Sequence, residues 1–215
     1  MNTIFADPSA LFAKLLALLV GLVLHEFMHG YVADRLGDNT ARAQGRLTLN
    51  PAAHIDPFAT LLLPLGLILL GSPIVFAAAK PVPFNPWMLK GGRWGAAMVA
   101  AAGPLTNLVI AIIAGIALQF FAASPVIGVI LFYMILTNVA LFIFNLIPFP
   151  PLDGSRILYA VVSARVREGM DRIERGGLAS IAIFLVVLYY TPLGTLVNQF
   201  IIGIVRILVP NLAPF

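Results

Sequence analysis

The chain has 215 residues, of which 60% are hydrophobic and only 10% are charged, and its mean hydropathy is +0.99. A soluble domain carries about 25% charged residues, so this composition excludes an ordinary water-soluble enzyme. The net charge of +4 comes from basic residues beside apolar runs, which argues against a nucleic-acid partner, and the absence of cysteine excludes disulfides and thiolate metal ligands. We therefore expect an all-α polytopic membrane protein, a single domain over residues 1–215 with room for about four to six transmembrane segments.

The first apolar run covers residues 11–32 and predicts a transmembrane span. An acidic residue and no basic n-region precede it, so we expect no cleaved signal peptide. The next run, 58–70, has only 13 residues and contains Pro64, which favours a re-entrant or broken helix. Residues 73–93 hold four prolines and cannot form one helix. A re-entrant hairpin or loop is therefore expected near 58–92.

Two long apolar runs, at 94–121 and 126–147, predict full spans. A charged segment follows and ends near Gly177. The last apolar stretch, 178–209, is interrupted by Pro192. It is compatible with two passes, or with one pass followed by a surface helix.

Basic residues gather in two loops and are missing from the first ten residues and from the AASP turn at 122–125. The positive-inside rule then places residues 33–93 and 153–177 in the cytoplasm, provided that the short run at 58–70 dips in and returns. We expect a multi-pass protein of the cell membrane, a prokaryotic plasma membrane, with its active site towards the cytoplasmic side. The basic residues are Arg35, Arg42, Arg46, Lys80, Lys90 and Arg93 in the first loop, and Arg156, Arg165, Arg167, Arg172 and Arg175 in the second.

Within the first apolar run, residues 25–29 read HEFMH. On a helix, His25 and His29 are at positions i and i+4 and share a face, so both imidazoles can reach one metal ion. Glu26 would stand beside that ion and take a proton from a water that zinc activates. The alternative is an accidental pattern, with both histidines hydrogen-bonded inside a helix bundle. Ionisable groups in an apolar span are costly, which favours the metal site.

A catalytic zinc needs three protein ligands and one open position, so a third ligand is required. His54 and Asp153 are the candidates. Asp153 follows Pro151 and precedes Gly154, which is typical of a backbone that leaves a helix to line a cavity. Its alternative role is the N-cap of the next helix. The spacing favours Asp153 over His54.

Three stretches resemble the site-2 proteases, zinc metalloproteases of peptidase family M50 that cleave substrates within the membrane. They are HEFMH at 25–29, AAGPLTN at 101–107 and NLIPFPPLDG at 145–154, and they match in order and topology. GRLTLNP at 45–51 and KPVPFNP at 80–86 widen the resemblance. The chain is similar to a minimal form of the family, without a PDZ domain.

The resemblance implies one zinc ion per chain, with Asp153 of the LDG motif as its third ligand. It also implies that Asn145 helps to bind the substrate carbonyl, and an amide N–H aimed at a developing oxyanion can contribute about 3 kcal/mol. The ordinary alternative for Asn145 is a helix-ending cap next to Pro148. Asn107 and His54 are possible neighbours of the site, although a buried amide such as Asn107 more often bonds another helix.

The resemblance further implies an intramembrane zinc metalloendopeptidase, with a catalytic core at about 10–160 and C-terminal helices at about 177–209. It would hydrolyse peptide bonds within or near transmembrane segments of membrane-protein substrates, by Glu26-assisted attack of water, in regulated intramembrane proteolysis. The segment 73–92 resembles the family's re-entrant hairpin, which could pair with an extended substrate. The expected partners are such a substrate and the lipid bilayer, with no nucleic acid, and a homo-oligomer is left open. The alternatives are a non-catalytic metal-binding scaffold or carrier, or a pseudoprotease that binds transmembrane helices.

Overall fold

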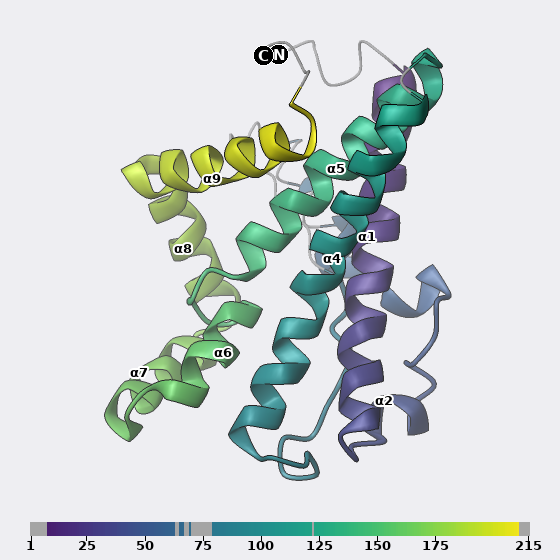
Figure 1. The fold of residues 1–215 in the computed structure, drawn as a ribbon. Helices are drawn as coiled ribbons and strands as arrows, with labels where there is room; N and C mark the ends of the chain where they lie inside the picture. Colours follow the sequence, from purple (N-terminus) through teal and green to yellow (C-terminus); the bar gives the residue numbers. More distant parts are fainter. Residues whose placement is uncertain (1–7, 63–64, 67–68, 70–78, 122, 211–215) are drawn as a thin grey trace.

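The computed structural model describes residues 8–62, 65–66, 69, 79–121 and 123–210 (Figure 1). Every regular element in these residues is a helix, which confirms the all-α fold expected from the sequence. The elements are α1 (Pro8–Arg35), α2 (Thr40–Ala43), the short helices η1 (Pro51–His54) and η2 (Pro57–Leu62), α4 (Arg93–Phe121), α5 (Pro125–Asn145), α6 (Asp153–Val161), α7 (Ala164–Arg175), α8 (Leu178–Tyr190) and α9 (Pro192–Leu208).

Three of these helices are long and apolar enough to cross a membrane. They are α1 with 28 residues, α4 with 29 and α5 with 21. At 1.5 Å per residue, even α5 is about 31 Å long, enough for a hydrocarbon core of about 30 Å. The pair α7 and α8, bent by 100° at their junction, adds a fourth candidate if it forms one broken span. The polytopic membrane protein predicted from composition is therefore confirmed.

The three long helices pack directly against one another (Figure 1). The buried faces of α1 and α4 are rich in small residues, which let two backbones approach closely when the surrounding lipid offers no hydrophobic driving force. Large apolar side chains such as Leu15, Ile113 and Phe120 point outward instead, where lipid would cover them. The small buried residues are Ala13, Ala17, Gly21, Gly30 and Ala33 on α1, and Gly95, Ala97, Ala100, Gly103, Ala111, Ala114 and Gly115 on α4.

The chain reverses after α5 and enters α6, which packs against α4. Beyond the charged helix α7, the last apolar stretch splits at Pro192 as the sequence indicated. Thr191 caps the second half by accepting a hydrogen bond from the Leu193 N–H. Helix α8 has 13 residues and α9 has 17, so each is shorter than a full span. Helix α9 packs across α5 and α8 (Figure 1).

The expected re-entrant region lies partly outside the described residues, which leave out 63–64, 67–68 and 70–78. Its first part is the helix η2, and the part at 79–92 is loop and turn without a strand. Several hydrogen bonds hold this loop against the end of α1 and the following segment. The Arg46 guanidinium donates to the carbonyls of Lys80 and Pro81, the buried Asp38 carboxylate accepts from the Asn85 N–H, and the Lys90 N–H donates to the Leu36 carbonyl.

Candidate metal centre

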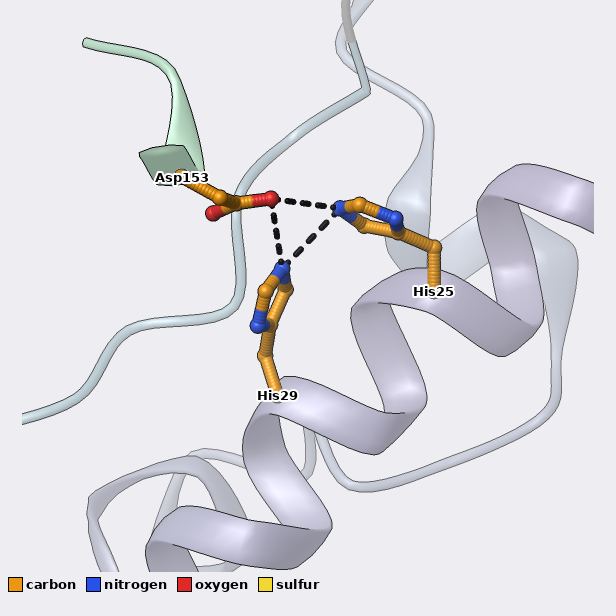
Figure 2. A group of neighbouring side chains, drawn as sticks. All are labelled: His25, His29 and Asp153. Atoms are coloured by element: carbon orange, nitrogen blue, oxygen red, sulfur yellow. Dashed lines mark hydrogen bonds and ion pairs between the residues drawn. The ribbon is translucent and has the colours of Figure 1, made fainter. Parts of the chain in front are cut away.

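His25 and His29 project from one face of α1, as the i, i+4 spacing predicted (Figure 2). Both side chains are buried, and their rings meet edge to face with centroids 4.5 Å apart. The two Nε2 atoms lie 2.9 Å from each other. One helix therefore supplies two imidazole nitrogens aimed at a common point.

Asp153 reaches the same point from α6, 124 positions after His29 in the chain (Figure 2). Its Oδ2 lies 3.1 Å from His25 Nε2 and 3.3 Å from His29 Nε2. Helix α6 begins at Asp153, and its N-cap is Leu152, without a side-chain capping bond. The Asp153 carboxylate is thus turned towards the histidines, not used as the N-cap that the sequence left open.

Gly154 permits the sharp reversal that brings Asp153 to this position. A Cβ on residue 154 would lie 2.2 Å from the Leu146 carbonyl oxygen and 2.7 Å from that of Ile147. Any side chain would therefore push the start of α6 away from the end of α5. The glycine of the LDG motif fixes the place of the aspartate by allowing backbone to pack on backbone.

Hydrogen bonds on the far side of each ring decide which nitrogens face the centre. His25 Nδ1 lies 2.7 Å from Asn107 Oδ1, and His29 Nδ1 lies 2.7 Å from the Val99 carbonyl oxygen. Both partners only accept, so each Nδ1 carries the proton of a neutral ring and donates it. Each Nε2 then offers a lone pair, the arrangement typical of a metal-binding histidine held by a second hydrogen bond.

The three atoms that converge are therefore all acceptors when the rings are neutral. Within the described part of the chain, Asp153 Oδ2 is buried and has no hydrogen-bond donor. The ligand atoms of His25, His29 and Asp153 lie within 4.8 Å of one another. Acceptors that face each other repel unless a cation lies between them, and two imidazoles with one carboxylate suit a catalytic zinc with an open fourth position. The residues fit this metal.

Gly103 of α4 leaves the necessary space beside these atoms. A Cβ there would lie 2.4 Å from His29 Nε2 and 2.6 Å from His25 Nε2, far inside any ordinary van der Waals contact. The glycine of the AAGPLTN stretch thus keeps the face of α4 next to the two Nε2 atoms free of any side chain.

Glu26, next to His25 on α1, is only partly buried. Its Oε2 accepts a hydrogen bond from the Val82 N–H at 2.8 Å. The loop that Arg46 and Asp38 hold against α1 therefore also holds this carboxylate. Glu26 stands outside the group of three converging ligands, as its place in the motif predicted.

Of the remaining predicted residues, one contacts a proposed metal ligand and the other two make different hydrogen bonds. Asn107 is fully buried and bonds His25 directly. His54 is buried away from the three ligands, with Nε2 2.8 Å from the Thr48 carbonyl oxygen. Asn145, the last residue of α5, donates from Nδ2 to the Leu141 carbonyl at 3.0 Å, so its role with substrate stays a prediction.

Asn138 is a further polar residue beside the site, and the motifs of the sequence did not point to it. This fully buried residue of α5 accepts a hydrogen bond from Asn107 at 2.8 Å. A signal was present, since an amide within an apolar span needs a partner or a function.

Comparison with known proteins agrees with these features. The family model described as peptidase family M50 matches residues 13–128 and 121–189. YwhC of Bacillus subtilis, named as a candidate zinc metalloprotease, is 40% identical over 192 residues, covering 85% of this chain and 82% of YwhC. Rip2 of Mycobacterium tuberculosis, named in the same way, is 32% identical over 81% of this chain and 65% of Rip2.

The zinc metalloprotease MJ0392 of Methanocaldococcus jannaschii is 32% identical over 69% of this chain, which corresponds to only 34% of that longer protein. No solved structure matches the chain. The two matched regions of the family model include both histidines and the aspartate of the converging group. The chain therefore belongs to peptidase family M50.

Proposed function

We propose that the chain is a zinc metalloendopeptidase that cleaves membrane-protein substrates within or near their transmembrane segments. The observation that carries this proposal is the convergence of two imidazole nitrogens and one carboxylate oxygen between helices of an apolar bundle. Glu26 adjoins this group, and no other acidic residue lies in α1 before Asp34. The family and the names of its members support the metalloprotease chemistry.

His25, His29 and Asp153 would hold the zinc. When bound, zinc lowers the pKa of water towards about 7 and polarises a substrate carbonyl. Glu26 would accept a proton from the attacking water and later give it to the leaving amine. Because the Val82 N–H engages Oε2, we assign the proton to Oε1.

The position of the ligands along their helices supports access of water. His29 lies six residues before the end of α1, about 9 Å along its axis, and Asp153 begins α6. Both therefore lie towards the end of the bundle where the basic loops gather, which the positive-inside rule assigns to the cytoplasm. A short polar path from that side would bring water to the site.

A substrate helix shields its own peptide bonds, so it must become extended before attack. The loop at 79–85 is irregular backbone tied to Glu26, and it would pair with such a strand next to the site. Asn145 would leave the Leu141 carbonyl and donate to the oxyanion that forms.

The test is incubation of the purified full chain with a panel of single-span peptides, with and without a zinc chelator, followed by sequencing of the fragments. Wild-type protein should cleave within or beside the apolar segment, and the chelator should stop it. Glu26→Gln should lose cleavage while retaining about one zinc per chain. A metal-binding scaffold, a carrier or a pseudoprotease would contain zinc and cleave no peptide, and cleavage by Glu26→Gln at the wild-type rate would remove Glu26 from the mechanism.

A further inference from the structure

Two asparagines from different spans meet behind His25. Asn107 of α4 donates from Nδ2 to Asn138 Oδ1 at 2.8 Å and to the Gly21 carbonyl at 3.1 Å. Asn138 of α5 donates from its own Nδ2 to the Met134 carbonyl at 2.9 Å, which fixes the orientation of its amide. Both asparagines are 0% exposed, so bulk water cannot replace these bonds. A chain of hydrogen bonds thus runs from α5 through α4 to the histidine on α1.

These contacts permit only one orientation of the Asn107 amide. Its NH₂ group has two donors, and both are used by oxygen acceptors on Gly21 and Asn138. If the amide were flipped, its oxygen would face those two oxygens without a proton between them. Asn138 therefore supplies half of the preference that points Asn107 Oδ1 towards His25.

That orientation decides which nitrogen of His25 can bind a metal. An oxygen 2.7 Å from Nδ1 requires the ring proton on Nδ1 and leaves the lone pair on Nε2. A flipped Asn107 would present N–H groups to Nδ1 and favour the other tautomer. The proton would then lie on Nε2, on the side of Asp153 and His29, and would block coordination by His25.

We propose that Asn138 is a positioning residue of the metal centre: through Asn107 it holds His25 in the tautomer that binds zinc. This inference rests on the proposed zinc site, although not on which substrate is cleaved. Space for the amide is provided by Gly21, where a Cβ would lie 2.7 Å from Asn138 Oδ1. Helix packing alone needs no amide directed at a ligand, whereas support of a metal-binding histidine requires it.

The test compares zinc affinity of the purified full chain, measured by competition with a chromophoric chelator. Asn138→Leu keeps the side chain branched at Cγ and removes the acceptor for Asn107. Asn138→Ser is a smaller replacement whose hydroxyl is too short to reach Asn107. Loss of the direct hydrogen-bond partner of a metal ligand typically costs about 10–100-fold in metal affinity. Because Asn138 acts through Asn107, we expect a loss of about 10-fold, the lower end of that range, in both variants. Asn138→Asp, whose protonated carboxyl reproduces both bonds, should stay within about threefold of the wild type.

Thr106→Val is the matched control, because Thr106 adjoins Asn107 but its hydroxyl bonds the Ala102 carbonyl of its own helix and, among the described residues, no group of another helix. Its zinc affinity should be unchanged. The second readout is the ¹⁵N spectrum of histidine-labelled, metal-free protein, which is tractable because the chain has three histidines. His25 should be protonated at Nδ1 in the wild type and should populate the Nε2 tautomer in Asn138→Leu or Asn138→Ser.

A folded Asn138→Leu or Asn138→Ser protein with wild-type zinc affinity and an unchanged His25 spectrum would overturn the proposal. So would equal losses in the Asp and Leu variants together with a loss of helical structure, since these would show a role in packing only. The proposed protease activity is judged separately. If the wild type binds zinc in this tautomer and cleaves no peptide, that function fails and the role of Asn138 stands.

Discussion

Replacing Gly103 with alanine should weaken zinc binding at least about 100-fold without unfolding α4. The new Cβ would lie 2.4 Å from His29 Nε2 and 2.6 Å from His25 Nε2, whereas real Cβ contacts are essentially never shorter than 3.0 Å. The rings must therefore retreat by at least 3.0 − 2.4 = 0.6 Å and 3.0 − 2.6 = 0.4 Å. Both shifts exceed the tolerance of about 0.2 Å in zinc–ligand distances.

The same substitution should stabilise α4, so a loss of zinc binding in this variant cannot be attributed to a less stable helix. Alanine is more favourable than glycine in a helix interior by about 1 kcal/mol, which opposes the cost of moving the rings. Gly115→Ala in the same α4 is the matched control, because its Cβ would lie 3.4 Å from the Leu208 side chain, an ordinary contact. Both variants gain the same helix propensity, and only Gly103→Ala meets the ligands.

The assay is zinc content by elemental analysis after purification, followed by chelator competition and circular dichroism of the same samples. Gly115→Ala should retain about one zinc per chain. Gly103→Ala should lose at least about 100-fold in zinc affinity, since it displaces the ligands themselves and loss of their hydrogen-bond partners alone costs up to about that amount. Wild-type zinc affinity in a folded Gly103→Ala protein would refute the placement of the ion between His25, His29 and Asp153.

Two further changes test the loop beside the site. Burial raises the pKa of the Asp38 carboxyl, but hydrogen bonds from Thr40 and from the Asn85 N–H outweigh it and hold the pKa below its usual 3.8. A carboxyl with a lowered folded pKa stabilises the fold fully above its unfolded pKa, and this contribution is lost as the pH falls through the folded value. Asp38→Asn should therefore lower the thermal midpoint at pH 7 and approach the wild type below pH 3.8, and an equal deficit at both pH values would contradict this. Val82→Pro removes the N–H that holds Glu26, whereas Val82→Ala keeps it. The proline variant alone should therefore have a lower kcat in peptide cleavage, with KM and zinc content unchanged. Equal rates in both variants would show that this bond does not position Glu26.

Much of the fold followed from local patterns. The lengths of the apolar runs predicted α1, α4 and α5 to within a few residues, because a span must cover the membrane thickness with apolar side chains. Helix α8 and helix α9 were harder to interpret, since each is shorter than a full span and only its packing shows where it lies. Hydropathy indicates whether a segment is apolar enough to leave water, but it does not indicate which helix that segment packs against.

For the metal centre too, some features followed from the sequence and others only from the tertiary structure. The pairing of His25 with His29 was determined by the sequence alone, because helical periodicity places i and i+4 side chains on one face whatever surrounds them. Residue spacing favoured Asp153 over His54 as the third ligand without excluding His54, and the resemblance to a family then selected Asp153. The structure then brought Asp153, and not His54, to the two rings.

Only the tertiary structure decided the supporting contacts. Asn107 and Asn138 bond each other because small residues let α1, α4 and α5 approach closely, and Gly103 matters because α4 crosses over the two rings. Such contacts join residues far apart in the chain, and their geometry depends on how whole helices pack, which no local spacing encodes. The sequence by itself therefore determined a membrane-embedded pair of histidines, while helix packing added their third partner and chose the nitrogen that each one presents.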